Sequence, residues 1–256
     1  MGRKFDISYV IDFIPKLLSY LHVTLFIVAA SILLGLVIGL LVALPRLYNV
    51  PALKQISQVY VSFFRGTPIL IQLFLVYYGV PELFKLIGID LSRTDVLVFV
   101  ILTYAMNSGA FISEAIRAAI NAVDRGQVEA AYSIGMNGYQ AFRKIILPQA
   151  LAVSVPVFAN LVIANLKDTS LAFSLGAMEM TGKSQTLGAA TQHFVETYIS
   201  LTLIYFVISM GLERLFRSAE RRLLRHEKTD QATQNEPKSF RRFGRRQLVA
   251  DIRKGG

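Results

Sequence analysis

The sequence contains no cysteine and only three histidines among its 256 residues. Without cysteine there is neither a disulfide framework nor a thiolate metal site. His22, His193 and His226 are scattered along the chain, so neither a metal site nor a catalytic triad is indicated. We therefore expect no catalytic residue and no metal site on this chain.

Acidic residues are also scarce. The sequence has 17 Asp and Glu but 27 Lys and Arg, which gives a net charge of +10. In a soluble protein this balance would indicate a nucleic-acid partner. Here the basic residues lie between and after apolar runs, as in membrane proteins. The chain is 54% hydrophobic, with a mean hydropathy of +0.48. These features predict a membrane protein that contacts lipid and binds no nucleic acid.

Five apolar runs approach the roughly 20 residues that a helix needs to cross a hydrocarbon core of about 30 Å. The runs are Val23–Leu44, about Ile56–Val80, Val96–Ser113, Ile145–Leu166 and about Phe194–Leu212. The first run is too long for a signal-peptide core and has no small-residue cleavage site, so we interpret it as a retained span. The predicted fold is an all-α membrane protein with five transmembrane helices.

Composition divides the chain into three parts. Residues 1–22 mix apolar and charged positions and are expected to lie in the membrane interface. Residues 23–225 form the predicted transmembrane domain. Residues 226–256 are basic and poor in apolar side chains, which predicts a disordered tail. Lys and Arg are concentrated after the last run, so we predict a cytoplasmic C-terminus and an external N-terminus.

The segment 117–148 is long for a connection between membrane helices, and its apolar residues recur every three or four positions. Gly135 is suited to end a short helix in the left-handed conformation. Gly138 is suited to begin a second helix, and Pro148 fits the first turn of the helix after it. We predict two short helices joined by a bend, on the cytoplasmic side.

Polar residues within or beside apolar runs are costly in a membrane and usually functional. Lys167 and Asp168 follow the fourth run; they form either a polar lining or outer gate, or an ion pair that ends the helix. Asn107 lines a pathway or packs against another helix, and packing is favoured. Glu114 lies at the inner mouth or pairs with Arg117 one turn away, and the local pair is favoured.

The second run contains Arg65, Thr67 and Pro68. Thr67 and Pro68 predict a bend in the span. Arg65 is suited to bind lipid headgroups, to neutralise a carboxylate of another span, or to hold a substrate carboxylate. A headgroup contact or a structural role is favoured.

The spacing of Glu129–Ala131, Gly135 and Ile145–Pro148 resembles the EAA loop of permease subunits in bacterial ABC importers. The segments Phe64–Pro68 and Lys167–Leu171 extend the resemblance over roughly Thr24–Arg222. Together they are similar to the polar amino acid uptake branch, which includes histidine, glutamine, arginine and cystine permeases. The residues that the resemblance assigns to coupling with an ATPase are Glu129, Ala130, Ala131, Gly135, Ile145, Leu147 and Pro148.

The resemblance implies a type I ABC importer-like fold in the bacterial cytoplasmic membrane. The implied partners are ATP-binding cassette ATPases, a second permease copy or paralogue, and an external amino acid-binding protein. ATP and Mg²⁺ would bind the ATPase, so no cofactor is expected on this chain. Met178–Gly182 favours the L-cystine permeases, and Glu179 would meet a substrate ammonium group. The candidate pathway or substrate residues are Asn107, Lys167, Asp168, Thr169, Ser170 and Glu179.

Two alternatives stay open at the level of sequence. A secondary transporter or channel for small polar solutes would work without an ATPase. A membrane enzyme ranks last, because no nucleophile and base are recognisable.

Overall fold

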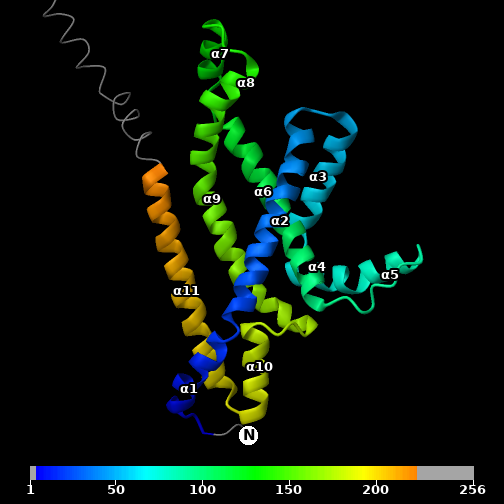
Figure 1. Ribbon diagram of the computed structural model, residues 1–256, viewed down its shortest axis with the longest axis vertical. Helices are drawn as coiled ribbons and strands as arrows, with labels where there is room; N and C mark the ends of the chain where they lie inside the picture. The colour runs from blue at the N-terminus through cyan, green and yellow to red at the C-terminus, as the bar shows by residue number, and fades with distance from the viewer. Residues whose placement is uncertain (1–3, 224–256) are drawn as a thin grey trace, which may run out of the picture. The chain divides into compact units, whose positions relative to one another are not determined.

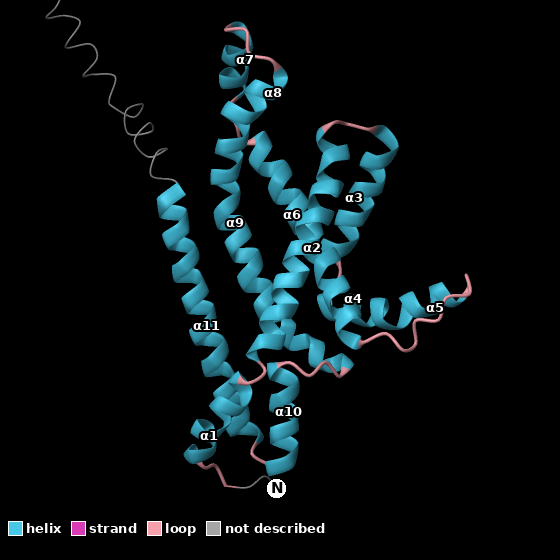
Figure 2. Cartoon of the chain, in the orientation of Figure 1, coloured by secondary structure: helices cyan, strands magenta, loops and turns pink. Residues whose placement is uncertain are grey.

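The computed structural model describes residues 4–223, and every regular element in that range is a helix (Figures 1 and 2). The chain divides into a unit that ends at Phe216 and a second that begins at Arg217, of which only the end of the last helix is described. The predicted tail, 226–256, lies outside the described residues. The elements are α1 (Ile7–Leu18), α2 (Leu21–Leu47), α3 (Pro51–Gly66), α4 (Ile69–Phe74), the π-helix η1 (Leu75–Gly79), α5 (Val80–Lys85), α6 (Val96–Asn121), α7 (Arg125–Ser133), α8 (Gly138–Ala141), the π-helix η2 (Phe142–Ile146), α9 (Leu147–Asp168), the 3-10 helix η3 (Thr169–Leu175), α10 (Met180–Thr191) and α11 (Phe194–Leu223).

Within residues 4–223, four helices are long and apolar enough to cross a membrane. They are α2, α6, the helix that runs without a break from Gly138 to Leu175, and α11. A fifth span is formed by Pro51–Gly66 and Ile69–Lys85, two helices that meet at 114°. The prediction of an all-α protein with five spans is confirmed when this bent pair counts as one.

The bend of the second span lies at Thr67 and Pro68, as predicted. Thr67 has extended backbone angles, φ −118° and ψ 148°. The residue before a proline is pushed out of the α region, and Pro68 has no N–H to donate to the preceding turn. Helix α4 therefore starts at Ile69 in a new direction (Figure 1).

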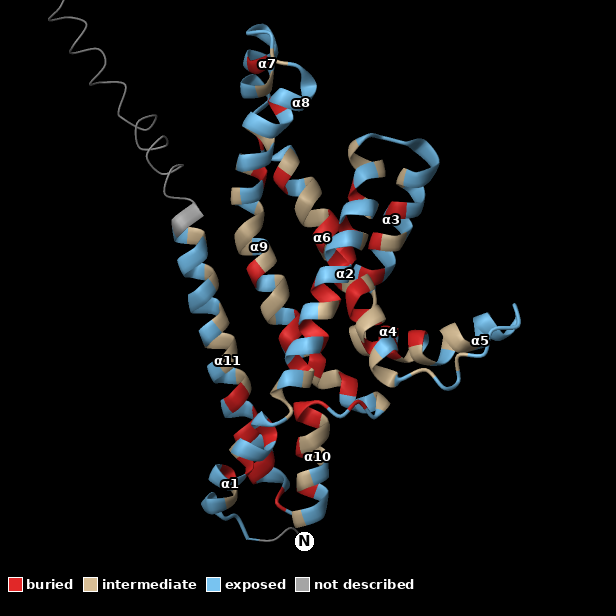
Figure 3. Cartoon of the chain, in the orientation of Figure 1, coloured by how far each residue is buried: buried red, intermediate tan, exposed pale blue. Residues whose placement is uncertain are grey.

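Helices α2 and α6 form the most extensive helix contact in the unit, and buried residues line it (Figure 3). Glycines let the two backbones approach. A Cβ added to Gly39 would lie 2.7 Å from Cγ2 of Ile112, and one added to Gly109 would lie 2.7 Å from Cγ2 of Ile38. Close approach through small residues is the usual means of helix association in lipid, where hydrophobic burial offers little.

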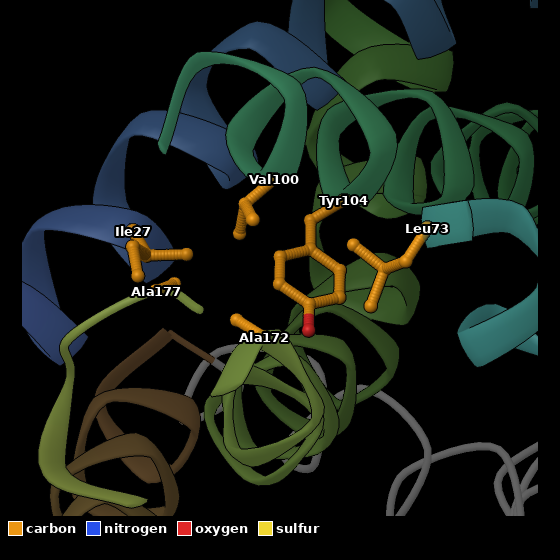
Figure 4. Close-up of a cluster of buried hydrophobic side chains, with 6 residues drawn as sticks. All are labelled: Ile27, Leu73, Val100, Tyr104, Ala172 and Ala177. Atoms are coloured by element: carbon orange, nitrogen blue, oxygen red, sulfur yellow. The ribbon is translucent and has the colours of Figure 1, made fainter. Parts of the chain in front are cut away.

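A second core joins α2, α4 and α6 to the segment that follows α9. Tyr104 lies at its centre, and its hydroxyl donates to the carbonyl oxygen of Asp168 at 2.6 Å. Figure 4 shows the buried members: Ile27, Leu73, Val100, Tyr104, Ala172 and Ala177.

Helix α1 packs one face inside the protein. The backbone N–H of Asp6 donates to Glu196 of α11 at 2.9 Å, and the hydroxyl of Ser200 donates to the carbonyl of Val10 at 2.8 Å. The buried apolar residues of this contact are Phe13, Leu17, Met180, Leu201 and Ile204. Ile7 and Ile11 are exposed on the other face. The predicted interfacial placement of residues 1–22 therefore concerns only that outer face, and it stays a prediction.

Candidate coupling loop and polar sites

The loop between α6 and α9 begins with α7, which is capped at both ends. The carboxylate of Asp124 accepts from the N–H of Gly126 at the N-terminus. At the other end Gly135 has φ +84°, and the N–H groups of Gly135 and Met136 donate to the carbonyls of Tyr132 and Ala131 at 3.0 and 3.1 Å. This is the paired bonding of a Schellman C-cap, so the predicted left-handed end at Gly135 is confirmed.

The second part of the loop starts at Gly138, again as predicted. Asn137 and Gln140 form a capping box, each side chain accepting from the other residue's backbone N–H. The prediction of a separate second short helix is wrong, however, because α8 continues through η2 into α9. Pro148 lies in the first turn of α9, directly after η2, whose π-type bonding includes the N–H of Leu147 donating to the carbonyl of Phe142. The second helix of the loop is thus the end of the fourth span.

Apolar side chains are exposed around this loop. Tyr132, Ile134 and Tyr139 are 52%, 75% and 69% exposed, whereas Ala131 is buried. Glu129 is also exposed and has no ion-pair partner among the residues that the structure describes. The loop therefore offers an apolar tip beside a free carboxylate. Of the predicted coupling residues, Ala130, Gly135 and Pro148 are exposed, Leu147 is 37% exposed, and Ile145 is half-buried.

Asn107 faces the break in the second span. Its Nδ2 donates to Oε1 of Gln72 at 2.9 Å and to the carbonyl of Phe64 at 3.2 Å. The amide of Gln72, only 1% exposed, donates to the carbonyls of Phe64 and Thr67 at 2.9 and 3.0 Å and to Oγ1 of Thr67 at 2.8 Å. The favoured interpretation, that Asn107 binds another helix, matches these contacts. Sequence reasoning missed Gln72, although one amide inside the apolar stretch Ile69–Phe74 was a visible signal.

Glu114 lies among three arginines. It pairs with Arg117 of its own helix at 2.9 Å, with Arg46 of α2, and with Arg65 of α3 at 4.0 Å. The predicted local pair is confirmed, but it is one of three. Arg65 also lies over the ring of Phe111, 5.5 Å from its centroid. Arg65 thus lies beside a carboxylate of another span, a structural role, which was one of the two interpretations favoured from sequence.

Residues Lys167–Ser170 lie where α9 changes into η3. The side chain of Thr169 is buried and donates to the carbonyl of Leu166 at 2.7 Å, and Ser170 donates to the carbonyl of Lys167 at 2.7 Å. Lys167 is exposed and Asp168 is half-buried. In the described residues these two side chains form no ion pair within 4.0 Å. Their charged groups remain available to a solute.

Glu179 is fully buried and caps α10. Its Oε1 accepts from the N–H of Gly182 at 2.9 Å, and its Oε2 accepts from the hydroxyl of Tyr205 at 3.3 Å. Burial raises the pKa of this carboxyl, although the hydrogen bonds oppose the shift. The structure brings Glu179 to α2 and α11, through Thr24 and Tyr205, and not to Lys167. Its predicted role with a substrate ammonium group stays a prediction.

Comparison with known proteins agrees with this arrangement. Residues 35–225 match the family model described as the binding-protein-dependent transport system inner membrane component. The chain is 50% identical over 227 residues to the L-cystine transport system permease protein TcyL of Bacillus subtilis, covering 89% of this chain and 95% of the relative. It is 40% identical to the probable amino-acid ABC transporter permease protein PatM of Vibrio harveyi, covering 86% of this chain and 96% of the relative.

Two solved structures show the same fold. A chain from the crystal structure of an amino acid ABC transporter with histidines superposes with a TM-score of 0.78 at 31% identity, covering 86% of this chain and all of the other. A chain of the MetNI methionine ABC transporter in an inward-facing conformation superposes with a TM-score of 0.61 at 20% identity, covering 81% of this chain and 97% of the other. The apolar spans, the capped loop and these matches together show that the chain is a multi-pass membrane permease of the family of binding-protein-dependent transport system inner membrane components.

Proposed function

We propose that this chain is the permease subunit of an ABC importer that carries a polar amino acid, L-cystine, across the cytoplasmic membrane. The observation that carries the proposal is the loop Asp124–Pro148, a capped and well-defined projection whose apolar tip has nothing to cover it in the described residues. A separate ATPase that holds ATP and Mg²⁺ would cover the tip, and an external binding protein would deliver the amino acid. Cystine is the substrate named for a relative that is 50% identical.

A second permease copy fits the exposure of the fourth span. Only 11% of its most apolar stretch is buried, against 56% for α6. Apolar surface of this kind faces lipid or another permease. Two copies would enclose a pathway between them, and the charged groups of Lys167 and Asp168 are candidates to line it.

The proposal is tested at Gly135. A β-branched side chain at φ +84° is strained, so Gly135→Val should distort the end of α7. In proteoliposomes that hold the permease, its ATPase and its binding protein, we expect cystine uptake to fall at least tenfold while the amount of inserted permease is unchanged. Gly138→Ala is the matched control in the same loop, because an added Cβ there meets only ordinary contact with Tyr132 at 3.9 Å. Normal uptake by Gly135→Val would contradict the coupling role.

The proposed orientation has an external N-terminus and a cytoplasmic loop. Since the chain contains no cysteine, single cysteines can be labelled without background. In intact cells a membrane-impermeant maleimide should label Ile87→Cys but not Ile134→Cys, and both should react after lysis. Ile87 and Ile134 are 68% and 75% exposed, so both thiols are accessible to the reagent. The reverse pattern would overturn the orientation.

A further inference from the structure

An unassigned basic pocket lies where α2 and α6 end and α3 begins. It has a volume of about 310 Å³. Three cationic side chains and no acidic one line it, among the residues that the structure describes. The lining residues are Arg46, Leu47, Asn49, Lys54, Gln58, Arg117 and Asn121.

The charges around this pocket do not balance. Among the described residues, Glu114 is the one carboxylate that pairs with Arg46 and Arg117, and it also lies 4.0 Å from Arg65. Lys54 adds a further cation, held by the side-chain oxygen of Asn49 at 2.9 Å. The Nε of Arg117 is buried and has no hydrogen-bond partner in the described part of the chain. Positive charge in excess at the edge of a membrane attracts anions, so the pocket is suited to an anionic group.

An apolar pocket adjoins the basic one. It has a volume of about 490 Å³ and lies between α2, α6 and the start of α9. Leu47 and Asn121 line both pockets, so the two are neighbours. The rest of its lining is mostly apolar, and Ser154 of α9 lies in it.

We infer that the two pockets together bind one phospholipid with an anionic headgroup. The phosphate would lie between Arg46, Lys54 and Arg117, because guanidinium groups bind phosphate oxygens with paired hydrogen bonds. An acyl chain would lie in the apolar pocket. A free phosphate would satisfy the basic pocket alone and would leave the apolar pocket without an occupant, so the adjoining pair favours a lipid. Basic pockets between membrane helices are a known means of binding anionic headgroups.

The test uses the full-length chain in nanodiscs of equal parts phosphatidylglycerol and phosphatidylcholine, with retained lipid measured by native mass spectrometry after extraction. We expect wild type to retain phosphatidylglycerol preferentially. Lys54→Gln and Arg117→Gln should each reduce that retention by about fivefold. Arg143→Gln removes the same charge from an exposed position outside both pockets and should change nothing.

Two further variants separate the parts of the site. Glu114→Gln removes the competing carboxylate and should raise retention of phosphatidylglycerol, the opposite sign to Lys54→Gln. Ser154→Phe should fill the apolar pocket and lower lipid retention without changing the basic pocket. Size-exclusion profiles verify that each variant is folded. Lys54→Gln is the least disruptive of the charge variants, because in the described residues the Lys54 side chain has one hydrogen bond, to Asn49.

Three results would overturn the inference. The first is equal retention of phosphatidylglycerol and phosphatidylcholine by wild type. The second is an equal loss with Arg143→Gln, which would reduce the effect to general surface charge. The third is a site for free phosphate, shown by glycerol phosphate binding as tightly as the intact lipid and unchanged by Ser154→Phe.

Discussion

The amide of Gln72, which lies in α4, hydrogen-bonds to Phe64 and Thr67 on the other side of the break in the second span. Gln72→Leu is therefore the sharpest test of how the fold is stabilised. The substitution keeps a side chain of similar size but removes three donated hydrogen bonds and one accepted from Asn107. Phe64 keeps a donor in Asn107, and the hydroxyl of Thr67 still donates to the carbonyl of Phe63. The carbonyl of Thr67 loses its side-chain donor.

One orphaned carbonyl in a partly buried position costs about 1–3 kcal/mol. A loss of about 2 kcal/mol should lower the melting temperature of a chain of this size by roughly 5 °C. Thermal unfolding in detergent, followed by size-exclusion chromatography, measures the shift. Gln55→Leu is the matched control, since Gln55 is exposed on α3 of the same broken span. An equal shift in both variants, or none in Gln72→Leu, would refute the argument that side chains replace the missing backbone donors here.

Two other predictions concern packing. Gly39→Ala should destabilise the protein by about 1–3 kcal/mol, because the new Cβ would overlap Ile112 at 2.7 Å. The control is Gly211→Ala, whose new Cβ meets nothing within 4 Å, so it should be neutral or stabilising by up to about 1 kcal/mol. Equal melting temperatures for the two variants would disprove the contact. Tyr104→Phe should cost about 1 kcal/mol in the same thermal assay, because the carbonyl of Asp168 loses its donor, and an unchanged melting temperature would show that water replaces it.

The features that the sequence predicted best are those fixed by neighbouring residues. Thr67 and Pro68 bend the second span because proline acts on its own peptide and the one before it. Gly135 ends α7 because the positive φ at this position is strained for a residue with a Cβ, whereas glycine has none. The pair of Glu114 and Arg117 follows from a separation of three residues on a helix. Each of these needs only a few adjacent positions, so no knowledge of the tertiary fold is required.

The features that sequence reasoning missed depend on contacts between distant segments. Arg46 reaches Glu114 across 68 positions of the chain, and Gln72 meets Asn107 across 35. The continuity of α8 with α9 was missed for a different reason. Pro148 suggested a new start, but the π-helical turn before it lets the backbone pass the proline without ending the helix.

The polar residues of the spans are best understood from the backbone that they serve. A membrane offers no water to a carbonyl that loses its helical donor, so a departure from α-helix needs a side chain to replace it. Asn107 does so at the break in the second span, where Pro68 cannot donate to the carbonyl of Phe64, and Thr169 donates to the carbonyl of Leu166 where α9 changes into η3. Both were candidates for the pathway, yet each is already engaged with a carbonyl. In the described residues the charged groups of Lys167 and Asp168 bind no backbone carbonyl. They are therefore the first positions at which substrate recognition should be sought.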